Sequence, residues 1–348
     1  MTREIPIRPP SHGRQVAIWL FLCAGLVFTM VLLGGTTRLS NAGLSIVEWK
    51  PLTGILPPLS EAEWQAVFAQ YRAFPEYEMR HIGMTLAEFK SIFWLEYLHR
   101  LWGRFIGAVF FFPFLYFWLR GALDRKLAAR LLGVFLLGAF QGWLGWYMVQ
   151  SGLVERPDVS PYRLAAHLGL ASIVFALLFR LGLSCRPTAA GKRPPSLFGA
   201  ATAGTVALVF LTILAGAFVA GIDAGLTYNT FPRMGEGFAP DGYWALEPAW
   251  RNFFENIPSV QFNHRLLGGF TFLWVAALWL ASWRVTVSKR ARLALGLLLA
   301  MATLQAGLGI ATLLHAVPLP LGVAHQAGAL LLFTLALWAE DETRREGN

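Results

Sequence analysis

The chain has 348 residues, of which 56% are hydrophobic and only 14% are charged. A soluble domain carries about 25% charged residues, so this composition excludes an ordinary soluble globular protein. The formal net charge of +9 does not indicate a nucleic-acid partner, because the basic residues gather in short segments between apolar runs, such as 120–130 and 284–292. The composition therefore predicts an all-α integral membrane protein that contacts lipid and binds no nucleic acid.

Apolar runs of about 20 residues recur along the chain, long enough to cross the roughly 30 Å hydrocarbon core of a bilayer. They predict eight transmembrane helices, at residues 16–36, 91–119, 128–150, 163–184, 197–220, 259–283, 291–313 and 319–339. Lys and Arg are concentrated on the side of the N-terminus, whereas acidic residues are concentrated on the opposite side. Positive segments mark the cytoplasmic face, so both termini are predicted to be cytoplasmic.

The first predicted helix follows three arginines and lacks the usual small-residue cleavage site, which favours a retained span over a cleaved leader. The chain also begins without a long, Arg- and Ser-rich transit segment. We therefore expect a multi-pass protein of the bacterial cell inner membrane. Between the first two spans, Ser60 with Glu63 and Thr85 with Glu88 have capping-box spacing. The first pair predicts a short surface helix, and the second predicts that the helix at 91–119 starts earlier, outside the bilayer.

The chain contains an internal repeat. The sequence GLSIVEWKPLTGILPP at 43–58 corresponds to GLTYNTFPRMGEGFAP at 225–240, and EYLHR at 96–100 corresponds to QFNHR at 261–265. Gln141 and Gly145 likewise match Gln305 and Gly309, and His167 matches His325. Because each copy holds four helices, both copies have the same orientation, and a pseudo-two-fold axis should run along the membrane normal.

The repeat predicts two tandem four-helix bundles side by side. The expected organisation is a cytoplasmic tail at 1–15, an N-terminal bundle at 16–185, a cytoplasmic linker at 186–196, a C-terminal bundle at 197–340 and a cytoplasmic tail at 341–348.

Four histidines fall near the outer ends of predicted helices: His99, His167, His264 and His325. Each bundle has one on its second and one on its fourth helix, at similar depth. Ionisable residues in membrane spans are costly and commonly mark function. Two imidazoles facing each other across a four-helix bundle suit the axial positions of a heme iron. Hydrogen bonds between helices, a proton relay or a zinc site are alternatives; no carboxylate or thiolate set accompanies the histidines, which disfavours zinc.

The two copies differ at one position beside these histidines. Glu96 in the first copy corresponds to Gln261 in the second. Glu96 is three residues before His99, so it lies on the same helix face. A carboxylate near a heme can transfer protons, whereas an amide cannot. This asymmetry predicts chemistry in the first bundle; an ion pair with Arg100 is the structural alternative and is compatible with it.

Arginines follow the histidine in both copies, as Arg100 and Arg265. Because a heme carries two carboxylates, and arginine suits bidentate carboxylate recognition, both are candidate heme-binding residues. Snorkelling of the side chain toward the membrane surface is the alternative.

Five stretches of the sequence resemble the heme A synthase family of proteobacteria and mitochondria. They are GGTTRLSNAGLSIVEWKPLTGILPP, EFKSIFWLEYLHRLWGR, RLAAHLGLA, QFNHRLLG and AHQAGALLL, and the resemblance covers roughly residues 15–340. It implies oxidation of a ring methyl of heme O to a formyl group, giving heme A for terminal oxidases. Heme O synthase and cytochrome oxidase assembly factors are the partners it implies.

The resemblance also implies a division of labour between the bundles. His99 and His167 would hold the substrate heme O, His264 and His325 would hold a permanent heme b, and Glu96 matches the glutamate essential in the family. Some bacterial members carry a cysteine pair in the first outer loop, and this chain has none there. The alternative function is a diheme b-type, quinol-oxidising electron-transfer protein, against which the Glu96–Gln261 difference and the family motifs argue.

Overall fold

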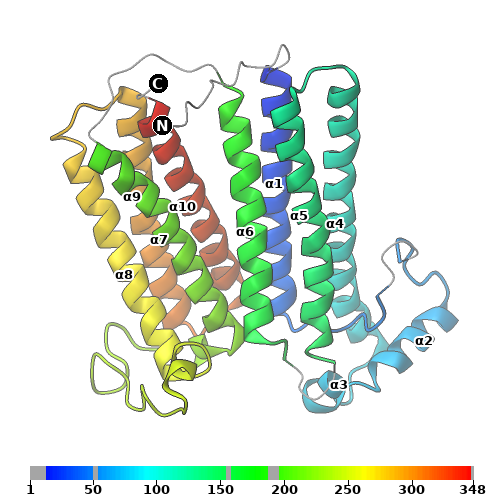
Figure 1. Cartoon of the computed structure of the whole chain (residues 1–348). Helices are drawn as coiled ribbons and strands as arrows, with labels where there is room; N and C mark the ends of the chain where they lie inside the picture. Colours follow the sequence, from blue (N-terminus) through cyan, green and yellow to red (C-terminus); the bar gives the residue numbers. More distant parts are fainter. Residues whose placement is uncertain (1–12, 50–53, 154–157, 187–195, 346–348) are drawn as a thin grey trace.

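The computed structural model describes residues 13–49, 54–153, 158–186 and 196–345, and its long elements are all helices (Figure 1). They are α1 (Gly13–Leu39), α2 (Glu61–Tyr71), α3 (Pro75–Arg80), α4 (Leu86–Leu119), α5 (Arg125–Gln150), α6 (Pro161–Ser184), α7 (Ser196–Gly221), α8 (Ile257–Ala281), α9 (Lys289–Leu314) and α10 (Leu319–Arg345), with short 3-10 turns η1 (Ala224–Leu226) and η2 (Ala249–Phe253). Within this part of the chain, eight helices are long and apolar enough to cross a membrane. The prediction of an eight-span, all-α membrane protein is confirmed.

The eight spanning helices lie in two neighbouring groups (Figure 1). Helices α1, α4, α5 and α6 pack against one another, and we call them the N-terminal group; α7, α8, α9 and α10 do the same and form the C-terminal group. Contacts of α6 with α7 and of α10 with α1 and α6 join the groups. The predicted pseudo-two-fold axis between the two copies stays a prediction.

The start of α1 and the end of α10 lie on one side of the helical layer, and α2 and α3 lie on the other (Figure 1). We call the latter the outer side. Both predicted capping boxes are present: the Ser60 side chain accepts a hydrogen bond from the Glu63 N–H, and Thr85 does the same for Glu88. The first begins the short helix α2, and the second begins α4 on the outer side, as predicted. α4 is therefore longer than its membrane crossing requires.

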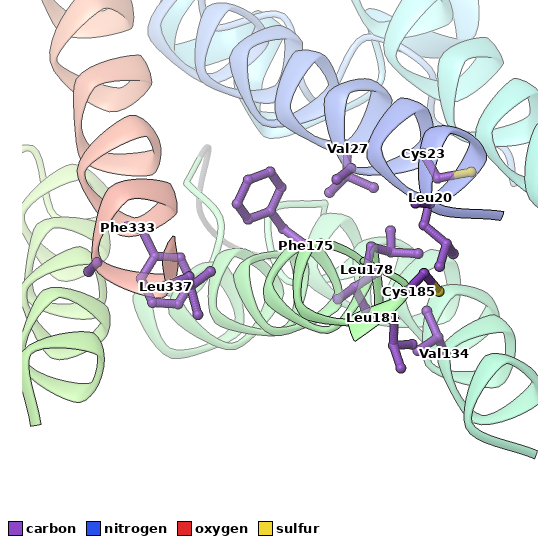
Figure 2. Close-up of a cluster of buried hydrophobic side chains, with 14 of the residues drawn as sticks. Leu20, Cys23, Val27, Val134, Phe175, Leu178, Leu181, Cys185, Phe333 and Leu337 are labelled. Carbon is purple, nitrogen blue, oxygen red and sulfur yellow. The ribbon is translucent and has the colours of Figure 1, made fainter. Parts of the chain in front are cut away.

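The core between the groups is built on α6, whose apolar side chains face both α1 and α10. Figure 2 shows part of this cluster, with Leu20, Cys23 and Val27 of α1, Phe175, Leu178 and Leu181 of α6, and Phe333 and Leu337 of α10. All are at most 8% exposed. Cys23 and Cys185 are both buried in this cluster, where a thiol packs as a small apolar side chain.

Ion pairs join the two groups at both ends of the layer. On the outer side, Arg38 at the end of α1 pairs with Asp223 after α7 at 3.0 Å. On the opposite side, Arg186 after α6 pairs with Asp341 at 3.1 Å and with Glu342 at 3.3 Å. Both acids belong to α10, which continues to Arg345, beyond the predicted helix end at 339. Hydropathy alone misses this last turn because its buried residues are acidic and paired rather than apolar.

Candidate heme site

The four predicted histidines form one pair in each group of helices. His99 lies on α4 and His167 on α6, whereas His264 lies on α8 and His325 on α10. The His264 and His325 rings have centroids 6.4 Å apart and are nearly perpendicular, at 84°. The His99 and His167 imidazoles are close enough to interact electrostatically. Residues separated by more than 60 positions in the sequence are therefore brought together, as the four-helix pattern predicted.

The spacing of His264 and His325 fits a pair of axial ligands to one iron. A bond from a metal to an imidazole nitrogen is about 2 Å, and a ring centre lies roughly 1 Å beyond its nitrogen, so two axial rings are about 6 Å apart. The separation of 6.4 Å matches this value. Direct hydrogen bonding between the rings would bring their centres closer. The residues present therefore fit a bis-histidine heme.

Each of the four rings lies against a glycine of a neighbouring helix. A Cβ atom added at Gly34, Gly145, Gly216 or Gly309 would lie 3.0, 2.9, 3.1 or 2.8 Å from Cε1 of His99, His167, His264 or His325, respectively. At such distances a side chain at any of these four positions would require the imidazole to shift. The glycines occupy equivalent places in the two copies, on α1 and α7 and on α5 and α9. They allow each imidazole to lie directly on a helix backbone.

A glutamine contacts the histidine of α6 and that of α10 in the same way. Nε2 of Gln141 donates to the His167 carbonyl oxygen at 2.9 Å and lies 3.2 Å from its Nδ1. Nε2 of Gln305 donates to the His325 carbonyl oxygen at 2.9 Å and lies 3.1 Å from its Nδ1. These glutamines are visible in the sequence only as repeated polar residues within spans, and no role was predicted for them.

Glu96 connects α4 to the first outer segment, the part of the chain between α1 and α4. Its Oε2 accepts hydrogen bonds from Ser45 Oγ at 2.8 Å and from the Ile46 N–H at 2.7 Å, and its Oε1 accepts from Arg100 Nη2 at 2.6 Å. The residue is only 3% exposed. The ion pair considered as the structural alternative is therefore present, and the carboxylate lies one helical turn from His99.

Gln261 makes the corresponding connection in the second copy with the opposite polarity. Its Nε2 donates to the carbonyl oxygens of Ala224 at 2.8 Å and Tyr228 at 3.3 Å. Tyr228 matches Ile46 in the repeat, so a carboxylate that accepts from a backbone N–H is replaced by an amide that donates to a backbone carbonyl. Each side chain holds the outer segment of its own copy, but only Glu96 carries a titratable group.

Arg100 and Arg265 also bind the outer segments. Nη2 of Arg100 donates to the Ile46 carbonyl oxygen at 2.7 Å, and Nη2 of Arg265 donates to the Tyr228 carbonyl oxygen at the same distance. Nη1 of Arg100 donates to the Glu48 carbonyl oxygen at 3.0 Å. Neither arginine snorkels freely toward solvent, because both are fixed to backbone carbonyls. Recognition of heme carboxylates by these two residues stays a prediction.

A second buried polar cluster lies in the outer segment, between α2 and α4. The Tyr71 hydroxyl donates to Oε2 of Glu76 at 3.1 Å and lies 2.6 Å from Nδ1 of His81. Burial, the first cause, raises the pKa of the Glu76 carboxyl to about 7, and the negative charges of Glu96 and Asp158 act in the same direction. His81, which follows α3, is half-buried against Tyr71.

The fold and these contacts define a class: an α-helical membrane protein with two repeated sets of four spans, each set enclosing a histidine pair. Residues 17–337 match the model of the family described as cytochrome oxidase assembly protein. The chain is 54% identical to a heme A synthase of Nitrosospira multiformis over 336 residues, which cover 96% of this chain and 94% of that protein. The chain belongs to the cytochrome oxidase assembly protein family.

Two further relatives extend the similarity across distant organisms. The heme A synthase of Rhodospirillum centenum is 50% identical, with 96% of this chain and 89% of that protein covered. The human protein named heme A synthase COX15 is 47% identical, with 95% of this chain and 83% of that protein covered. Two bacterial proteins and a human protein are therefore similar to nearly the whole of this chain.

Proposed function

We propose that this chain is a heme A synthase, an oxidoreductase that converts a ring methyl of heme O to a formyl group. The similarity to heme A synthases over about 95% of the chain carries this proposal. The product, heme A, is the form of heme that terminal oxidases require. The protein works within the membrane, where its apolar substrate is dissolved.

The two histidine pairs have different roles in this proposal. His99 and His167 bind the substrate heme O, and His264 and His325 bind a heme b that remains in the protein. The difference between Glu96 and Gln261 supports this division, because the residue that can exchange a proton stands beside the substrate pair only. A bound heme b supplies one-electron redox chemistry, which suits a reaction that removes electrons from a methyl group.

Glu96 is the proton-transfer residue of the substrate site in this proposal. Its carboxylate is held in place by hydrogen bonds from Ser45, the Ile46 N–H and Arg100. Arg100 and Arg265 are proposed to orient the heme carboxylates from the outer side. Their backbone contacts hold both guanidinium groups near that side of the site.

The location follows from the charge pattern. We propose a bacterial inner membrane, with the side that holds the start of α1 and the end of α10 facing the cytoplasm, because the short basic connections 120–130 and 284–292 lie on that side. Heme O synthase and cytochrome oxidase assembly factors are the proposed partners, since one class supplies the substrate and the other uses the product.

Extraction of heme from the purified protein tests the function. A heme A synthase is expected to contain heme b together with heme O, a hydroxylated intermediate or heme A. The matched sample is His167→Ala, which should lose the substrate-derived hemes and keep heme b. If cells that make heme O yield protein with two equivalents of heme b and nothing else, the quinol-oxidising electron carrier is the better assignment.

A further inference from the structure

The two members of each histidine pair are held differently. Gln141 hydrogen-bonds the backbone of His167 and contacts its Nδ1, and Gln305 does the same for His325. By contrast, Nδ1 of His99 is buried and makes no hydrogen bond with any of the described residues, and His264 interacts with the backbone of Thr212 rather than with a glutamine. Each pair therefore combines one imidazole that contacts a glutamine amide with one that does not.

An imidazole that binds iron through Nε2 carries its proton on Nδ1 and needs an acceptor there. The glutamine amides can supply it. Among the described residues, the Oε1 atoms of Gln141 and Gln305 are buried and accept no hydrogen bond. Rotation about the last side-chain bond presents Oε1 to Nδ1 and gives up the hydrogen bond from Nε2 to the histidine carbonyl oxygen, since an amide carries one donor group and one acceptor.

The structure also makes specific room for the second glutamine. A Cβ atom added at Gly328 would lie 2.1 Å from Oε1 of Gln305. Gly328 is one turn after His325 on α10, so the backbone of that helix accommodates the amide beside the ring. Gln326, which directly follows His325, has a different contact: its Nε2 donates to the Val31 carbonyl oxygen of α1 at 3.1 Å.

We propose that Gln141 and Gln305 are positioning residues that fix the ring plane and the Nδ1-protonated form of His167 and His325. One imidazole in each pair is thereby anchored, and in the N-terminal pair its partner, His99, exchanges more readily. In the substrate site this makes His99 the ligand that yields when heme O enters, turns over or leaves. This inference rests on the proposed heme-binding function of the four histidines.

The C-terminal group gives the sharper test, because its heme is a resident cofactor. Gln305→Leu removes the acceptor, Gln305→Glu replaces it with a stronger acceptor, and Gly328→Ala pushes the amide away from the ring. The matched control is Gln326→Leu, which removes a glutamine next to His325 that does not contact the imidazole. Each purified variant is examined for heme b content, for its low-spin spectrum and for its midpoint potential.

We expect Gln305→Leu and Gly328→Ala to retain heme b about 10- to 100-fold more weakly, the usual effect of removing a hydrogen-bond partner of a metal-bound histidine. Gln305→Glu should keep the heme and lower its midpoint potential, because a carboxylate strengthens the imidazole as an electron donor. Gln326→Leu should match the unaltered protein. Normal heme retention and potential in both Gln305 variants would overturn the proposal.

In the N-terminal group the proposal predicts unequal single-ligand variants. His99→Ala, which keeps the anchored His167, should retain added heme O better than His167→Ala. Equal retention, or better retention by His167→Ala, would contradict the assignment of His99 as the exchangeable ligand. Absence of heme from the unaltered protein would instead count against the proposed function, so the two failures are distinguishable.

Discussion

Ser45 donates a hydrogen bond of 2.8 Å to the buried Glu96 carboxylate, which ties the outer segment after α1 to α4 at a point one turn from His99. The same carboxylate accepts from Ile46 and from Arg100. The Glu96 side chain therefore holds the outer segment against α4. A group proposed to move protons is also a structural anchor, and experiments on it have to separate the two effects.

Glu96→Gln is expected to reduce heme A formation by about 10²- to 10⁴-fold, the usual size of a general acid–base contribution. The amide has no titratable proton to transfer. Its NH₂ group also has to face either the Ile46 N–H or the Arg100 guanidinium, both of which are donors. Turnover per bound heme and heme content are measured on the same purified sample. Full heme occupancy with near-normal heme A formation would contradict the proton-transfer role.

Ser45→Ala is the control for the anchoring role of Glu96. It removes one hydrogen bond but keeps the carboxylate and its pairing with Arg100. We expect a smaller loss of turnover than with Glu96→Gln, together with easier proteolysis of the outer segment. Equal loss of turnover in the two variants would assign the effect of Glu96→Gln to the anchor rather than to the proton.

Replacement of His264 or His325 by Ala should remove the low-spin bis-histidine spectrum of heme b. The two rings lie at the separation that one iron requires, and each of them fits against its own glycine. Visible and electron paramagnetic resonance spectra of the purified variants provide the measurement. Unchanged heme b spectra in both single variants would exclude this pair as the ligands.

Reporters fused after Lys126 and Lys289 should be active as cytoplasmic domains, and reporters inserted near Pro57 and Gly237 should be active as periplasmic domains. The first two residues belong to helix starts on the side opposite α2 and α3. A cytoplasmic result at Pro57 or Gly237 would reverse the proposed orientation. A reporter after Lys192 is also predicted to be cytoplasmic, and this residue lies outside the described residues.

The outer segment should become less stable as the pH rises from about 4.5 through about 7. Burial raises the pKa of Glu76 to about 7 from its ordinary value of 4.5, so the folded state binds the proton more tightly than the unfolded state. The resulting stabilisation is complete below about pH 4.5 and is lost as the pH rises through about 7. Hydrogen exchange of residues 61–81 in detergent, compared at pH 5.5 and pH 8, measures this change.

Glu76→Gln should make the protection of residues 61–81 less dependent on pH. His81 titrates in the opposite sense, because burial and Arg80 lower its pKa, and its contribution is lost as the pH falls below about 6.5. Tyr71, Arg80, Asp158 and Glu96 surround Glu76 in both forms. If Glu76→Gln and the unaltered protein lose the same protection between pH 5.5 and pH 8, another group is responsible.

Hydropathy and spacing alone determined the membrane class, the eight spans and the start of α4 at the Thr85 capping box. These features are local: a run of apolar residues, or a side chain three residues from its partner, forms its structure without distant contacts. The internal repeat also singled out the four histidines, because the same residue type recurred at the same depth in both copies. The difference between Glu96 and Gln261 was visible for the same reason.

The tertiary structure decided which atoms these residues meet. The contact of Ser45 with Glu96, the use of Arg100 and Arg265 on backbone carbonyls and the contacts of Gln141 and Gln305 with histidines all join segments far apart in the chain. The last turn of α10 forms because its acids pair with Arg186 from another helix end. A sequence pattern records which groups are polar, but the packing of helices determines the partner that each polar group finds.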